Sequence, residues 1–143
     1  MKTLIAKFAL FTLAVLTIGV AAASAQITTQ LTFKVSQSFV VGNTTLAAGS
    51  YIIRPVSGTD QSVVEIANVT GKPSVMAEVE LVSPPAGQTG SQLVFNKYKS
   101  VLALSQIFPG GGVQGYQLTP GHPEKIAAKA ETPTKQTVAA TTK

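Results

Sequence analysis

The only histidine of the chain, His122, lies between Gly121 and Pro123 near the end of the sequence. Histidine serves in acid–base catalysis and in metal binding, but both need several titratable or ligating groups that converge on one point. The chain has no cysteine, and a lone histidine in a loop bounded by glycine and proline is typical of a surface residue. We therefore expect neither a catalytic nor a metal-ligating role for His122.

Two carboxylates, Glu78 and Glu80, stand two positions apart in a segment of alternating apolar and polar residues. On a strand they share one face, a geometry that a glycosidase or a calcium site could use. The alternative is the solvated face of an amphipathic strand. We favour this alternative because a catalytic carboxylate pair comes from different strands that meet in a cleft, and the other acids before residue 120 are only Asp60 and Glu65.

The remaining motifs also predict turns rather than chemistry. No Gly-x-Ser-x-Gly elbow of a serine hydrolase is present. The run Gly110–Gly112 lacks the Lys-Ser or Lys-Thr of a phosphate-binding loop, and no helical pattern follows it. Asn43 and Asn68 begin Asn-x-Thr sequons, which we interpret as turn residues because turn asparagines next to threonine arise readily by chance. The sequence thus predicts no catalytic residue, no metal ligand and no cofactor, and we expect that the protein is not an enzyme.

Three tyrosines at strand spacing, Tyr51, Tyr98 and Tyr116, are the residues that we select as a candidate ligand or partner surface. With neighbouring phenylalanines they could stack on a sugar or line an apolar pocket. Aromatic residues at strand spacing more often belong to the core, and the absence of tryptophan further disfavours a carbohydrate platform. Both interpretations stay open at this stage.

Period-two alternation of apolar and polar residues runs from Leu31 to Leu118 and is interrupted by clusters of Gly, Pro, Asn and Ser. This pattern is typical of an all-β domain. We expect a small single-domain antiparallel barrel or sandwich of about seven to eight strands. The predicted strands cover residues 31–35 continuing into 39–41, 44–46, 51–56, 62–69, 75–82, 92–98, 101–108 and 113–118.

Two turn segments predict hairpins. The run Ala47–Ser50 contains a glycine and should join the short strand 44–46 to the longer strand 51–56. Lys99 and Ser100 should form a second tight turn between the strands that flank them.

The N-terminus has the order of a cleavable secretory signal. Lys2 and Lys7 precede the apolar stretch Phe8–Val20, and Ala23–Ala25 reads Ala-Ser-Ala. We expect cleavage before Gln26, which makes residues 1–25 a signal peptide. A membrane anchor is disfavoured because the apolar run is shorter than the roughly 20 residues that cross a bilayer. The mature chain should be exported, periplasmic or extracellular, without a transmembrane segment, a lipid-anchoring cysteine or a disulfide.

The charge balance argues against nucleic acid as a partner. The whole chain carries 11 basic and 6 acidic residues. Two of the basic residues lie in the signal and four in the last 24 residues, so the β region is close to neutral. A nucleic-acid-binding domain needs a dense basic face.

The character of the chain changes after Thr119, which we take as the end of a β-domain that spans residues 26–119. Glu124–Glu131 predicts a short helix with Pro123 at its first position. Residues 134–143 contain one valine and no aromatic residue, so we expect a disordered basic tail. Residues 120–143 are therefore predicted to be a short helix followed by a tail.

Two blocks of sequence resemble a family of small exported β-rich proteins common in acidobacteria. Residues 39–54 read FVVGNTTLAAGSYIIR, and the family pattern runs Phe, x, Val-Gly, a few polar residues, Leu-Pro-Ala-Gly, x, Tyr, x, Ile or Val, Arg. Ala47 stands where the family usually has proline. Residues 93–98 and 104–108, LVFNKY and LSQIF, are similar to the family's second block. The resemblance implies export and a β fold, and it brings no activity or site residue with it.

These observations lead to two expectations of function. The first is an exported non-enzymatic β-domain that serves as a structural, adhesive or assembly component of the envelope or the extracellular space. The alternative is a small binding module for an apolar or glycan ligand. The sequence does not identify the partner, for which an envelope protein, a glycan and a second copy of the chain are the candidates. An exposed apolar patch would favour the first expectation, and a closed concave pocket the second.

Overall fold

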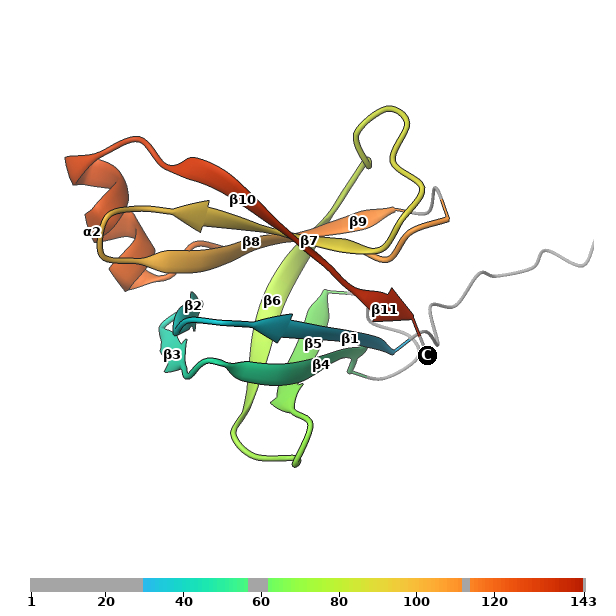
Figure 1. Cartoon of the computed structure of the whole chain (residues 1–143). Helices are drawn as coiled ribbons and strands as arrows, with labels where there is room; N and C mark the ends of the chain where they lie inside the picture. Colours follow the sequence, from blue (N-terminus) through green and yellow to red (C-terminus); the bar gives the residue numbers. More distant parts are fainter. Residues whose placement is uncertain (1–29, 57–61, 112–113, 143) are drawn as a thin grey trace, which may run out of the picture.

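The computed structural model describes residues 30–56, 62–111 and 114–142 (Figure 1). The predicted signal peptide and its cleavage site before Gln26 lie outside these ranges. In the described ranges, no helix has both the length and the apolar character needed to span a membrane.

The described residues form eleven strands and one short helix, which confirms the predicted all-β class. The number of strands exceeds the predicted seven to eight because residues 31–35 and 39–41 form two separate strands and the C-terminal residues add two more. In chain order the elements are β1 (Leu31–Val35), β2 (Phe39–Val41), β3 (Thr44–Leu46), β4 (Gly49–Pro55), β5 (Val63–Asn68), β6 (Ser74–Val82), β7 (Gln92–Lys97), β8 (Leu102–Phe108), β9 (Gly115–Leu118), α2 (His122–Ala130), β10 (Thr134–Ala139) and β11 (Thr141–Thr142).

The strands belong to a single sheet that is not closed into a barrel. Its order is β10-β7-β8-β9-β6-β5-β4-β1-β11, and β2 attaches to β8 and carries β3. The long strand β6 connects two groups of strands, because its first part pairs with β5 and Val79–Val82 pair with β9. Figure 1 shows β7, β8, β9 and β10 on one side of the molecule, β1, β4 and β5 on the other, and β6 running between them.

The core lies where the two groups of strands face each other, and Phe39 is at its centre. Its ring centroid lies 5.1 Å from that of Tyr51 on β4 and 5.7 Å from that of Phe95 on β7, both edge to face. All three side chains are fully buried. Burial of each large aromatic ring contributes strongly to folding, and these contacts hold the two groups of strands together.

The predicted hairpin between residues 44–46 and 51–56 is wrong. β3 pairs with β2, with Val41 opposite Thr44, and β4 pairs with β1 and β5 instead. The two residues that link β2 and β3 are Gly42 and Asn43, and Gly42 has a φ of 56°. Such a two-residue turn favours residues that tolerate positive φ. The predicted turn at Lys99 and Ser100 is confirmed by the β7–β8 hairpin.

The predicted helix is confirmed, but the predicted disorder of the tail is wrong for residues 134–142. β10 pairs with β7 at six positions, and β11 pairs with β1 at two. Val138 and Ala140 also pack against the core. The tail composition alone predicts disorder because it provides little apolar surface. Strand edges of β7 and β1 supply the backbone partners that the tail itself lacks.

Candidate binding groove

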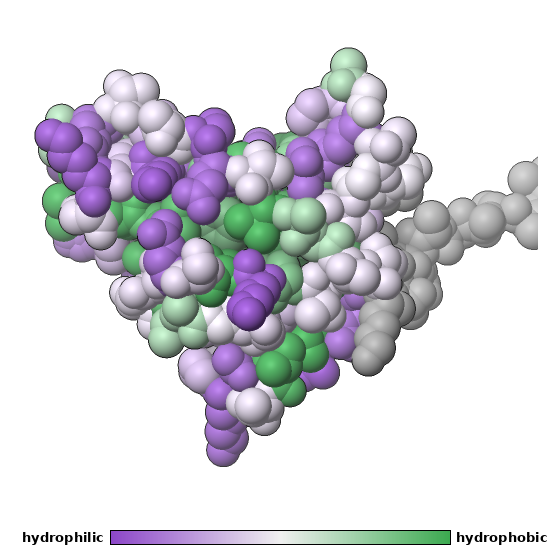
Figure 2. Space-filling model, in the orientation of Figure 1, coloured by the Kyte–Doolittle hydropathy of each residue, from purple (hydrophilic) through white to green (hydrophobic). Residues whose placement is uncertain are grey.

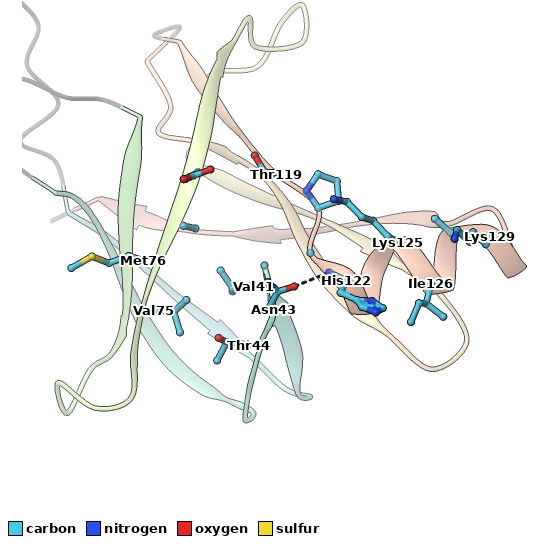
Figure 3. A pocket seen from close by; sticks show the side chains of 16 residues that line it. Val41, Asn43, Thr44, Val75, Met76, Thr119, His122, Lys125, Ile126 and Lys129 are labelled. Atoms are coloured by element: carbon cyan, nitrogen blue, oxygen red, sulfur yellow. Dashed lines mark hydrogen bonds between the residues drawn. The ribbon is translucent and has the colours of Figure 1, made fainter.

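An open groove of about 1060 Å³ lies between β6, the β2–β3 turn and α2. Its walls are Val75–Glu78 of β6, Val41–Thr44 of the turn, the link Thr119–Gly121 and one side of α2 (Figure 3). In the orientation of Figure 1, Figure 2 shows hydrophilic residues gathered over the corner of the molecule that holds α2, with hydrophobic residues visible beside them. The groove therefore joins segments that are far apart in the sequence.

The floor of the groove is apolar. Val41 and Ala77 are buried, and Val75 is half-buried and packs against the core. Figure 3 shows Val75 and Met76 on opposite sides of β6, with Val75 toward the β2–β3 turn. An occupant of the groove would thus contact side chains that already belong to the core.

The β2–β3 turn positions the start of α2. The side-chain Oδ1 of Asn43 accepts a hydrogen bond from the His122 backbone N–H at 2.8 Å, drawn as the dashed line in Figure 3. A Cβ atom on Gly121 would overlap the carbonyl oxygen of Gly42, so the chain can pass the turn this closely only with glycine at position 121. The sequence indicates Asn43 as a turn residue, and the structure adds its contact with the helix.

The opposite side of α2 is held by a buried carboxylate. Glu124 is 5% exposed, and its Oε1 accepts a hydrogen bond from the Asn96 side-chain amide on β7 at 2.6 Å. The Tyr98 hydroxyl lies 3.5 Å from the same oxygen. The pKa of Tyr98 is raised, mainly because the hydroxyl is buried and to a smaller extent because the negative charge of Glu124 is near. At the far end of the helix, Glu131 accepts a hydrogen bond from the Lys99 N–H. The helix is thus fixed through polar contacts at both ends.

This orientation turns the apolar and basic residues of α2 toward the groove. Ile126 is 57% exposed, and Lys125 and Lys129 also line the groove. In the part of the chain that the structure describes, no salt bridge involves either lysine, and the ion pair that does form joins Arg54 and Glu65 at 2.7 Å. The groove therefore combines an apolar floor with two ammonium groups that have no carboxylate partner among residues 30–56, 62–111 and 114–142.

The three tyrosines selected from the sequence do not form a surface. Tyr51, Tyr98 and Tyr116 are 1%, 6% and 4% exposed. Tyr51 stacks on Phe33 with ring centroids 5.9 Å apart, and its hydroxyl donates a hydrogen bond to the Ala47 carbonyl. The structure therefore places them in the core, which is the alternative that the sequence left open.

The residues considered for catalysis also occupy the positions that their patterns indicate. Glu78 and Glu80 are exposed, and Met76 on the same strand is 68% exposed, which confirms a solvated face of β6. His122 is exposed at the edge of the groove. In the described ranges, no group of three or more His, Asp or Glu side chains is arranged to hold a metal ion.

The groove itself was missed by the sequence analysis. Its residues come from β2, β6, the link before α2 and α2, and neither strand periodicity nor the helix pattern shows that these segments meet. The two lysines four positions apart on α2 are the one signal in the sequence, because residues i and i+4 share a helix face.

Comparisons with known proteins found no matching family model, no matching curated protein and no matching solved structure.

Proposed function

We propose that this chain is an exported, non-enzymatic β-domain that acts as an assembly or adhesive component by binding a protein partner in the groove. The observation that carries this proposal is the open apolar floor beside Ile126, an isoleucine that is 57% exposed. Exposed apolar surface rimmed by polar residues is typical of protein interaction sites. An open groove also suits a segment of a larger partner better than a small molecule, which prefers an enclosed site.

Export is the second part of the proposal. It is supported by the charge, the apolar stretch and the Ala-Ser-Ala site within residues 1–25, and by the resemblance of two sequence blocks to exported proteins of acidobacteria. We expect the exported protein to begin at Gln26. Terminal sequencing of exported material tests this, and a protein that still begins at Met1 would refute the signal peptide.

A binding module for an apolar ligand is the second candidate function. The groove volume of about 1060 Å³ supports it, because this volume is close to the upper end of the roughly 300 to 1,000 Å³ that ligand sites commonly have. The two candidates differ in the occupant: a protein segment in one case, a small apolar molecule in the other.

A photo-crosslinking residue at position 126 distinguishes them. Placed in the exported protein, it should capture a protein from the cell envelope. The matched control is the same residue at position 69, because Val69 is also exposed, at 49%, but does not line the groove. Equal capture from both positions, or capture of a small apolar molecule alone at position 126, would contradict the proposed function.

A further inference from the structure

The groove runs along an edge of β6 that has no partner strand among the residues that the structure describes. β6 pairs with β5 from Ser74 to Glu78, and with β9 only from Val79 onward. In the described part of the chain, Ser74–Ala77 therefore have a strand on one side only. Four consecutive residues, Val75–Glu78, line the groove. Because consecutive side chains point to opposite faces, a groove that all four line lies beside the strand and not over one face.

The hydrogen-bond pattern shows which backbone groups point into this groove. Pro73 accepts a hydrogen bond from the Asn68 N–H at 3.0 Å, and the Val79 N–H donates to the Ser62 carbonyl at 2.8 Å. In an antiparallel pair, alternate residues bond to the same neighbour. The odd-numbered residues of β6 thus bond to β5, and the backbone groups of Ser74 and Met76 point the other way.

Glu78, the next even-numbered residue of β6 after Ser74 and Met76, shows that this edge of β6 can pair with another segment. The Glu78 carbonyl accepts a hydrogen bond from the Thr119 N–H at 3.3 Å, at the point where the chain leaves β9. Beyond Thr119 the chain turns away toward α2, and the pairing stops. The N–H and C=O groups of Met76 and Ser74 continue the same row into the groove.

We propose, as a more specific form of the proposed function, that the partner is an acidic segment of another protein that binds in extended conformation and adds a strand to β6 at Ser74–Ala77. Strand addition uses main-chain hydrogen bonds for affinity and alternate side chains for specificity. Four residues of such a strand are about 13 Å long at roughly 3.3 Å per residue. The side chains of the added strand that point into the groove would contact Val41 and Val75. Its backbone hydrogen bonds to Ser74 and Met76 would continue the row that begins with the bond between Thr119 and Glu78.

Charge complementarity selects an acidic segment. Lys125 and Lys129 line the groove without a carboxylate partner in the described residues, and Glu78 is the only acid in its lining. Acidic side chains on the added strand would neutralise the two ammonium groups, whereas basic ones would be repelled. A second copy of the chain is disfavoured as the occupant. If β6 of the second copy paired with this edge, the β5 strand attached to it would lie on the α2 side of the groove and collide with α2.

Binding of designed peptides to the full exported chain tests the inference. The probe is a fluorescein-labelled peptide of eight residues that alternates valine and glutamate, and its affinity is measured by fluorescence anisotropy. The same peptide with N-methyl groups on alternate residues cannot donate along one edge, and we expect it to bind about tenfold more weakly or not at all, since about tenfold corresponds to one good hydrogen bond. A valine–lysine peptide should bind more weakly than the valine–glutamate peptide.

Two pairs of variants locate the binding. Met76→Pro removes the N–H that faces the groove, whereas Met76→Thr keeps it, so only the proline variant should lose affinity by about tenfold or more. Lys125→Glu combined with Lys129→Glu should reverse the preference between the two peptides. Lys34→Glu combined with Lys72→Glu changes the net charge equally at exposed positions outside the groove and should leave the preference unchanged.

Amide hydrogen exchange in the unmodified protein supplies a measurement that does not depend on the folding of Met76→Pro. The Met76 amide should exchange more slowly when the valine–glutamate peptide is bound, and the Val75 amide, which faces β5, should not change. Equal affinity for the N-methylated peptide, or an unchanged Met76 amide, would overturn strand addition. If position 126 still captured an envelope protein, the proposed function would survive this failure. Self-association that depends on Met76 would instead identify a second copy as the occupant and overturn the acidic partner.

Discussion

Asn43 and His122, 79 positions apart in the chain, are joined by a hydrogen bond of 2.8 Å from the helix backbone to the asparagine side chain. Through this bond the β2–β3 turn caps the first turn of α2, a role that a residue directly before a helix usually has. The residue in that position here is Gly121, which has no side chain to offer. The turn therefore supplies the cap and fixes one wall of the groove at the same time.

Removal of this cap should destabilise the protein moderately. Asn43→Ala is expected to lower the free energy of unfolding by about 0.5 to 1 kcal/mol, the lower part of the range for helix caps, because the site is exposed. Asn43→Asp keeps an acceptor oxygen and should remain close to the wild type. Urea denaturation measures both. An alanine variant as stable as the wild type would show that the bond does not hold the helix.

Close packing at Gly121 predicts a larger effect. Gly121→Ala places a methyl group against the Gly42 backbone, and overpacking of this kind costs about 1 to 3 kcal/mol. The backbone φ of Gly121 is −79°, so the expected loss comes from the clash and not from an unusual conformation. Gly90→Ala is the matched control, because a Cβ at Gly90 meets nothing within 4 Å. Equal melting temperatures for the two variants would contradict the close approach.

Substitutions of Tyr51 separate a core residue from a ligand surface. Tyr51→Ala should cost about 3 to 5 kcal/mol, as expected for a large buried aromatic residue. Tyr51→Phe keeps the ring against Phe33 and Phe39 and loses only the hydrogen bond to Ala47, for a cost of about 1 kcal/mol. Chemical denaturation provides the values. A nearly neutral alanine variant would disprove the core position.

Two substitutions in β10 can test whether the C-terminal residues are ordered. Val138 is half-buried and packs against the core, whereas its neighbour Thr137 is exposed. We expect Val138→Asp to lower the free energy of unfolding by about 1 to 2 kcal/mol, since it removes apolar burial and introduces a charge. Thr137→Asp should change it by no more than about 0.5 kcal/mol. Equal and small effects of both substitutions would support the disordered tail that composition predicts.

The ion pair between Arg54 and Glu65 predicts a dependence on pH. The hydrogen bond from Arg54 lowers the pKa of Glu65 below its ordinary value. A carboxylate whose pKa is lower in the folded state stabilises the fold above its unfolded pKa, and this contribution is lost as the pH falls through the folded pKa. Carboxyl titration by NMR should show the lowered pKa in the wild type and a value closer to the ordinary one in Arg54→Gln. An identical titration of Glu65 in both proteins would show that Arg54 is not the cause.

Much of the fold could be predicted from short stretches of sequence. Alternation over residues such as Val64 and Ile66 identifies the strands and their buried faces, because the side-chain period of a strand is two. Pro123 indicates the start of α2, since proline suits the first turn of a helix. These features depend on residues that are close neighbours in the chain.

Other features depend on which segments meet. Whether β3 pairs with β2 or with β4 is not visible in three residues of strand, and the tight turn at Gly42 together with the longer pairing of β4 with β1 decides it. The tail is ordered because the edge of β7 is available to β10. Composition describes what the tail can bury, but it does not describe the backbone partners that the rest of the fold offers.

The candidate site belongs entirely to this second kind of feature. The sequence by itself determined the local elements and the residue types: strands with one apolar face and a helix with two lysines four positions apart. Only the tertiary structure decided that the tyrosines are buried, that Asn43 reaches the start of α2, and that Lys125 and Lys129 line the same groove as the edge of β6 that no described strand pairs with. The physical reason is that strand alternation and helix caps are short-range preferences, whereas a groove is formed by surfaces that become neighbours only when the whole chain has packed.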